Sequence, residues 1–183
     1  MFERKQDNSA KGFTLLETMI ALAVLAIGIL GLAAMLGTAI ATMQGSREDF
    51  IAQQKAEQAI EAIFTAKYTN SVTWPQVSNF SGANPTGLFL SGPQTLTVPG
   101  TDGLVGTAVD LAAAPDYYLD PGPDGKLGTA DDVKISLTKF TRTISITNVV
   151  GDSNLRNVTV TVNYSAGPFQ KVYTLNTLIS AFD

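Results

Sequence analysis

The chain has 183 residues, with 12 basic and 16 acidic side chains and with neither histidine nor cysteine. The absence of cysteine excludes a disulfide framework and thiol chemistry, and the absence of histidine removes the usual general base and the commonest metal ligand. The acidic balance argues against a nucleic-acid partner recognised by charge. The sequence has no phosphate-binding loop and no carboxylate pair in an apolar setting that would raise a pKa, so it does not predict an enzyme.

Residues 1–12 are polar, whereas residues 13–43 are almost entirely apolar or small. The apolar run exceeds the roughly 20 residues that cross a bilayer and the roughly 7–15 of a signal-peptide core, so it predicts a membrane-spanning helix. Residues 1–12 hold three basic and two acidic side chains. Basic residues beside a span tend to stay cytoplasmic, so we expect a single-pass membrane protein with its N-terminus in the cytoplasm and its C-terminal domain on the other side.

Glu17 is the only ionisable side chain between Lys11 and Arg47. A carboxylate in a membrane helix costs about 2.5–3.5 kcal/mol at mid-bilayer and less near the interface. Glu17 is therefore expected to have a positively charged partner.

The segment Lys11 to Glu17, KGFTLLE, resembles the class III signal of the type IV pilin superfamily. The resemblance implies that residues 1–12 are a leader, that a prepilin peptidase cuts between Gly12 and Phe13, and that Phe13 is then N-methylated. It also implies that Glu17, the fifth mature residue, acts in assembly. The mature chain would keep nine basic and fourteen acidic residues, a net charge of −5. A plain signal anchor with a stray glutamate is the alternative.

Residues 13–67 are predicted to form one helix, because no proline occurs before Pro75. Three glycines interrupt its apolar part, which is either ordinary membrane-helix composition or a segment that softens inside a filament. Residues 44–67 are amphipathic and need a sheet of the same chain to lie against. Their apolar residues recur at three- and four-residue spacing: Ala52, Ala56, Ala59, Ile60, Ile63 and Phe64.

Residues 68–183 are predicted to form a β domain. Residues 68–119 are rich in Gly, Pro, Ser, Thr and Asn, which indicates turns and short strands, and in pilins this is the variable region. Residues 133–181 alternate apolar and polar side chains, which predicts about four antiparallel strands at 133–137, 139–149, 155–165 and 169–181. One face of this sheet should cover the helix, and the opposite, threonine-rich face is either wet or meets a neighbour. The expected fold is α+β and pilin-like. The residues expected to cover the helix are Ile144, Ile146, Val158, Val160 and Val162.

Residues 116–133, DYYLDPGPDGKLGTADDV, hold five aspartates among three glycines. A glycine-rich loop can fold its carboxylates and carbonyls around one point, and Ca²⁺ prefers such oxygen ligands. The spacing of the aspartates is not that of an EF-hand. The loop resembles the calcium loop of the major pseudopilins of type II secretion. That resemblance implies a ligand set of Asp120, Asp124, Asp131 and Asp132 with the Leu127 carbonyl. The alternative is a tight turn in which Asp and Gly satisfy backbone groups locally.

Residues 25–33 and the terminal sheet resemble the PilV-type minor pilins, which implies a structural subunit of a type IV pilus. The acidic loop favours a pseudopilin of type II secretion instead, and a non-polymerising, calcium-stabilised surface protein with one span is a third possibility. As a pilin, the protein would have the inner membrane, the prepilin peptidase, an assembly platform with its ATPase, and other subunits bound through the N-terminal helix as partners. It would end in an extracellular filament.

Overall fold

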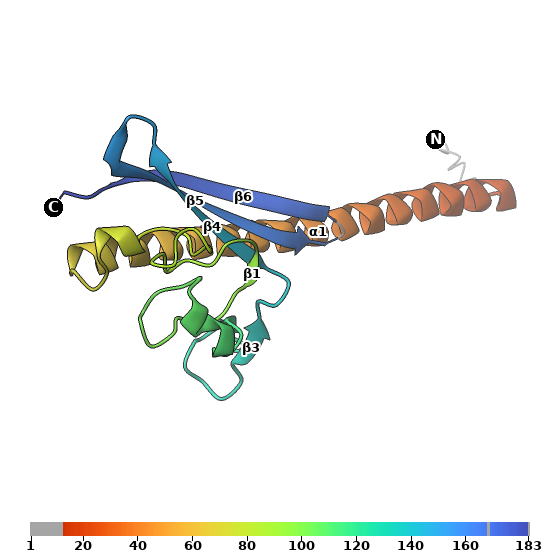
Figure 1. Cartoon of the computed structure of the whole chain (residues 1–183). Coiled ribbons are helices and arrows are strands. Elements are labelled where there is room, and N and C mark those ends of the chain that lie inside the picture. The colour runs from red at the N-terminus through yellow and green to blue at the C-terminus, as the bar shows by residue number, and fades with distance from the viewer. Residues whose placement is uncertain (1–12, 168, 183) are drawn as a thin grey trace, which may run out of the picture. The chain divides into compact units, whose positions relative to one another are not determined.

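The computed structural model describes residues 13–167 and 169–182. The predicted leader, residues 1–12, lies outside the described residues. The chain divides into two compact units, residues 1–43 and 44–183, and Figure 1 shows the elements in chain order. Helix α1, Leu15–Tyr68, contributes to both units and confirms the predicted long helix.

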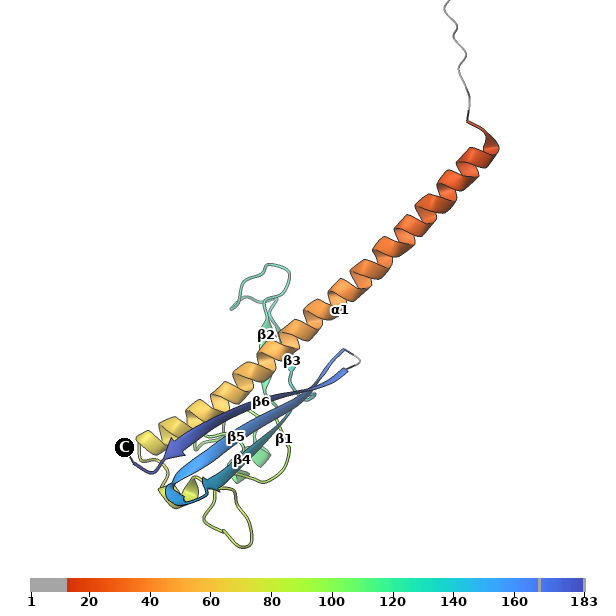
Figure 2. The same ribbon diagram turned by 90° about the horizontal axis from the view of Figure 1, so that it is seen from above.

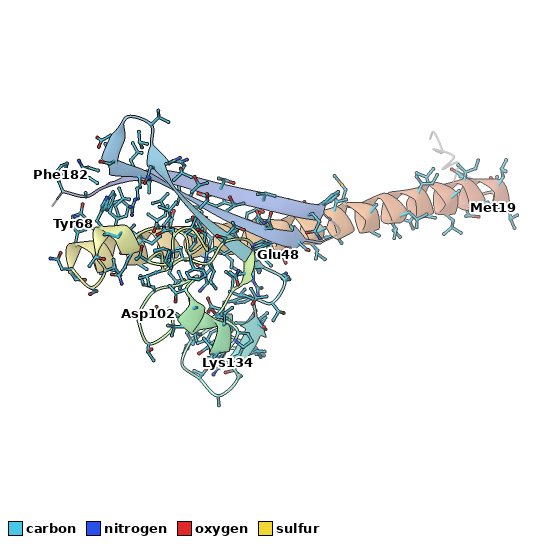
Figure 3. The ribbon with its side chains drawn as sticks, viewed as in Figure 1. Met19, Glu48, Tyr68, Asp102, Lys134 and Phe182 are labelled. Atoms are coloured by element: carbon cyan, nitrogen blue, oxygen red, sulfur yellow. The ribbon has the colours of Figure 1, made fainter. Side chains whose placement is uncertain are left out.

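In the first unit, α1 is apolar on every side. Residues 13–43 are all exposed, and Figure 3 shows their side chains, including that of Met19, projecting from all sides of the helix. By length and composition α1 is apolar enough to cross a membrane, with a mean hydropathy of 2.7 over its most apolar window. A Cβ atom added at Gly28, Gly31 or Gly37 would meet nothing within 4 Å. This surface therefore needs lipid or other helices to cover it.

In the second unit, four antiparallel strands form the main sheet in the order β1-β4-β5-β6 (Figure 2). Strand β1 is Gln94–Thr95, β4 is Thr141–Val149, β5 is Asp152–Ala166 and β6 is Phe169–Ser180. A two-stranded sheet pairs β2, Tyr117–Asp120, with β3, Val133–Ser136. Two 3₁₀ helices, η1 (Trp74–Gln76) and η2 (Ala108–Ala112), lie in the segment between α1 and β2. The predicted α+β class, with one long helix and a four-stranded antiparallel sheet, is confirmed.

The strand expected at 133–137 forms, but the expectation that it pairs with the strand following it is wrong. A turn in which the Phe140 amide donates to the Leu137 carbonyl (2.9 Å) separates β3 from β4. Leu137 and Phe140 are both fully buried, and they hold this turn in the core. Strand β3 therefore pairs back onto β2. The fourth strand of the main sheet is the two-residue β1, which lies in the region predicted to form turns and short strands.

The predicted face of the sheet covers the second half of α1. Side chains of β4 and β5 form one buried cluster with a stripe of the helix, in which Ala52, Ala56 and Ala59 are completely buried. Three alanines at this spacing let the helix backbone approach the strands closely. The five residues predicted to cover the helix are all buried: Ile144, Ile146, Val158, Val160 and Val162.

Three consecutive residues at the start of the second unit join α1 to different strands or loops. The Arg47 guanidinium lies 3.1 Å from the Asp120 carboxylate of β2 and 4.4 Å from the centre of the Tyr118 ring. Glu48 pairs with Lys139, which precedes β4. These pairs are partly exposed, so each contributes only about 0–1 kcal/mol. Their main effect is to fix how the helix is oriented on the sheets.

Asp49 is the third of these residues and contacts both β5 and β6. Its carboxylate lies 2.8 Å from the Lys171 ammonium and accepts a 2.7 Å hydrogen bond from the Tyr164 hydroxyl. The hydrogen bond from Lys171, and then that from Tyr164, lowers the pKa of Asp49. Burial, and then the bond to Asp49, raises the pKa of Tyr164 to about 12.

A second group of charges is buried between α1 and the sheets. The Lys55 ammonium lies 2.6 Å from the Asp116 carboxylate, and both side chains are mostly buried. Arg142 of β4 is 3% exposed, and burial lowers its pKa to about 10 against the opposing effect of Asp110 and Asp116. A buried ion pair of this kind specifies one arrangement more than it adds stability.

We predict that Ala59→Leu destabilises the second unit by about 1–3 kcal/mol, because extra methyl groups overpack a filled helix–sheet contact. Gln54→Leu places the same side chain on the exposed side of the helix and should change the free energy of unfolding by less than about 0.5 kcal/mol. Urea unfolding of residues 44–183 measures both. Equal effects would show that the alanine stripe is not a close contact.

We predict that one tyrosine ionises near pH 12 and that Tyr164→Phe removes this transition from the alkaline absorbance titration. Asp49→Asn should lower the pKa of Tyr164, because the acceptor would lose its charge, and Glu61→Gln should leave it unchanged. Because the folded pKa is raised, the folded protein keeps this proton between pH 10 and 12 while the unfolded chain loses it. The stability from Tyr164 is therefore complete below pH 10 and is lost as the pH rises to 12.

Candidate processing and assembly site

The predicted cleavage site lies at the start of α1. Gly12 lies outside the described residues. Phe13 is 80% exposed and precedes the helix, which begins at Leu15. An amine freed at Phe13 would therefore lie within one turn of the helix N-terminus.

Thr14 caps the helix. Its side-chain hydroxyl accepts a 3.2 Å hydrogen bond from the Glu17 amide, and its carbonyl accepts one of 3.2 Å from the Thr18 amide. Glu17 is thus the third residue of α1, the position that a carboxylate prefers in a capped helix. Sequence reasoning missed this role, although threonine followed three residues later by glutamate, ahead of an apolar run, is a known signal of a helix start.

The cap adds a favourable term to the free energy of placing the Glu17 carboxylate in a membrane helix. A carboxylate in the first turn gains about 0.3–1 kcal/mol from the helix dipole. Placing the same carboxylate in mid-bilayer costs about 2.5–3.5 kcal/mol. Among the described residues Glu17 has no ion pair, and its side chain is exposed. The local stabilisation is smaller than the cost of deep burial in a bilayer.

The acidic loop joins β2 to β3, and its carboxylates accept hydrogen bonds from the loop itself. Asp124 Oδ1 accepts one from the Lys126 amide (2.8 Å), and Asp132 Oδ2 accepts one from the Gly128 amide (2.7 Å). Asp131 accepts from the Thr129 hydroxyl (2.7 Å) and from the Asp124 amide (3.3 Å), and these two bonds, in that order, lower its pKa. The loop thus has the local hydrogen bonds of a tight turn.

The loop has donors that suit Ca²⁺, but they do not converge on one point. Within the described part of the chain, no group of three or more carboxylates is placed to hold a metal ion. Asp120 instead pairs with Arg47, and the Leu127 side chain is 65% exposed. One oxygen, Asp132 Oδ1, is shielded from solvent and accepts no hydrogen bond. That oxygen is the feature of the loop that fits a bound cation.

Gly122 shows how tightly the loop is folded. It has a φ of +64°, and a Cβ atom there would lie 2.5 Å from the Asp131 carbonyl oxygen. Only glycine fits both the backbone conformation and the space. This close approach brings the two ends of the loop together.

Comparison with known protein families gives one match. The family model of the prokaryotic N-terminal methylation motif matches residues 7–33, which include the predicted cleavage site, Thr14 and Glu17. No curated protein and no solved structure matches the chain. The motif indicates a type IV pilin-like or pseudopilin-type protein, which is a structural rather than a catalytic class. It implies a single-pass inner-membrane precursor that a prepilin peptidase processes and that assembles with other pilins.

Proposed function

We propose that the protein is a minor pilin of the PilV type, a structural subunit that is cut after Gly12, methylated at Phe13 and incorporated into a type IV pilus. The observation that carries this proposal is the methylation motif at residues 7–33, which opens an apolar helix exposed on every side. Such a surface is unstable in water and is suited first to a bilayer and then to the core of a filament.

The mechanism depends on the charge of Glu17. Cleavage frees a positive amine at Phe13, and Glu17 of an incoming subunit pairs with the Phe13 amine of a neighbour. The gain from a buried ion pair is roughly cancelled by desolvation, whereas one unpaired buried charge costs about 3–5 kcal/mol. The pair therefore acts as a register device. Only one axial position of the incoming helix pairs the Glu17 carboxylate with the Phe13 amine.

Two alternatives remain open. A pseudopilin of type II secretion shares the motif and the processing, and the acidic loop supports it. A single-span surface protein that never polymerises would keep the helix in the membrane. In the pilus, an assembly platform and its ATPase drive subunits out of the inner membrane, and the finished filament lies outside the cell.

We predict that mature protein from wild-type cells begins with N-methylated Phe13, as mass spectrometry of the N-terminal peptide would show. We also predict that Glu17→Gln leaves membrane insertion intact but reduces incorporation into sheared filaments at least tenfold, because the Phe13 amine would lose its counter-charge. Glu61→Gln removes a carboxylate from an exposed site on the same helix and should have no effect.

The same experiment separates the alternatives. In a deletion strain complemented with each variant, loss of surface pili supports the pilin, and loss of a secreted substrate with normal pili supports the pseudopilin. An intact leader in a functional protein, or normal incorporation of Glu17→Gln, would contradict the polymerising subunit.

We also propose that the acidic loop binds Ca²⁺ through Asp124, Asp131 and Asp132, with Asp120 and the Leu127 carbonyl as further donors. The unpaired oxygen of Asp132 supports this, because an anionic oxygen shielded from water without a partner is costly. A cation would also offset the repulsion among these carboxylates. The loop joins β2 to β3, so the ion would stiffen the small sheet.

We predict that calcium at about 100 times its Kd stabilises residues 44–183 by about 2.7 kcal/mol. For a domain of this size, that raises the Tm by about 5–10 °C over the value with a chelator. Asp131→Asn combined with Asp132→Asn should abolish the difference, and Asp152→Asn, outside the loop, should keep it. Identical melting of the wild type with calcium and with chelator would leave the loop as a plain turn.

A further inference from the structure

Thr14 accepts the hydrogen bond that decides whether Phe13 joins α1. In an α-helix each amide donates to the carbonyl four residues earlier, so a helix that included Phe13 would pair the Glu17 amide with the Phe13 carbonyl. In the structure the Glu17 amide donates instead to Thr14, at 3.2 Å from its hydroxyl oxygen and 3.1 Å from its carbonyl oxygen. The Thr14 hydroxyl therefore competes directly with the Phe13 carbonyl for one donor.

The sequence before Thr14 does little to stop the helix from extending toward the N-terminus. Residues 1–14 contain no proline, the residue that would end a helix outright. Gly12 weakens a helix without blocking it, and Ala10 and Lys11 are good helix formers. The start of α1 at Leu15 therefore depends strongly on the cap.

The position of this helix start matters because the predicted cut lies directly before Phe13. The family model of the methylation motif matches residues 7–33, which supports the cut independently of the cap. A peptide bond inside a helix is cleaved only when the helix opens locally, and the rate then follows the population of the open form. Phe13 lies outside the helix and is 80% exposed, so cleavage before it requires no opening of α1.

We propose that Thr14 is a positioning residue for the cut between Gly12 and Phe13, because its cap keeps that peptide bond ahead of α1, where a peptidase can bind it as extended chain. This proposal rests on the proposed function, since it requires a prepilin peptidase that processes the chain. Thr14 takes no part in the hydrolysis itself. It acts through the Glu17 amide, which it withholds from Phe13.

The proposal gives the two polar residues of the motif separate roles. The cap uses the backbone amide of Glu17, whereas the proposed assembly step uses its carboxylate. Glu17→Gln changes only the side chain, and glutamine suits the same position of a capped helix. We therefore expect Glu17→Gln to be cut at the wild-type rate, although it is poorly incorporated into filaments.

The test measures initial rates of cleavage of the full-length precursor in detergent micelles by membranes that contain a prepilin peptidase. Mass spectrometry of the released residues 1–12 gives the rate. Thr14→Val keeps the branched shape but lacks the acceptor, and Thr14→Ser keeps the acceptor. We expect Thr14→Val to be cut at least about threefold more slowly, and Thr14→Ser within about twofold of the wild type.

Thr18→Val is the matched control. It makes the same change one turn further on, where the Thr18 hydroxyl donates to the Leu15 carbonyl (2.8 Å) and caps no amide. It should be cut at the wild-type rate.

A proline at residue 15 tests whether the Thr14 hydroxyl acts through the helix start or by direct contact with the peptidase. At the first helical position proline loses no helical hydrogen bond, and its ring clashes with the carbonyl of residue 11 in an extended helix. It also biases residue 14 away from the helical conformation. With Leu15→Pro present, Thr14→Val should therefore change the rate by less than about twofold relative to Leu15→Pro alone.

The carbon-13 chemical shifts of Phe13 in the same micelles give a readout that does not depend on the peptidase. They should be non-helical in the wild type and in Thr14→Ser, and should move toward helical values in Thr14→Val. Unchanged shifts in Thr14→Val, an unchanged rate, or an equal loss of rate with proline at residue 15 would each overturn the role of Thr14 alone. A wild-type precursor that is not cut after Gly12 would instead contradict the proposed function, and this proposal with it.

Discussion

The constraint on which this structure depends is that one helix, α1, must be covered in two different ways. Its residues from 51 to 66 bury an alanine-rich stripe against the sheet of the same chain, which leaves that half complete within the described structure. Its residues up to 43 are apolar on every side and exposed. In the described part of the chain both sheets belong to the second unit, and the side chains of residues 13–43 are left exposed. Residues 13–43 therefore need either lipid or other helices to cover them.

The parts of the fold that were predictable are those with a long, unbroken pattern. The absence of proline before residue 75 predicted the long helix. The alternation of apolar and polar side chains through Val158, Val160 and Val162 predicted the central strand and its buried face. The parts that were not predictable depend on tertiary contacts. Strand β1 is two residues long and exists only because β4 lies beside it, and the Asn79 side chain closes an edge that no local pattern marks.

In the candidate site too, the local patterns were predictable from the sequence and the tertiary contacts were not. The motif around Gly12 and Glu17 is local, so the sequence identified it, and the family model matches the same region. The cap by Thr14 has a local signal in the sequence, a threonine and a glutamate three residues apart ahead of an apolar run. The acidic loop shows the limit of composition. The sequence shows the aspartates of the loop close together along the chain, but the hydrogen bonds that each one accepts depend on how the loop folds back at Gly122.

The charges of the second unit explain why its sheet is oriented firmly on α1 although few of them add stability. Arg47, Glu48 and Asp49 each contact a different strand or loop. A rotation of the helix by one residue, about 100°, would break all three pairs together. Each exposed pair is worth about 0–1 kcal/mol, so their sum is small beside the apolar core. Their geometry, however, permits only one rotation of the helix. The ion pair that we propose for Glu17 would act in the same way, because it gains little free energy but selects one register.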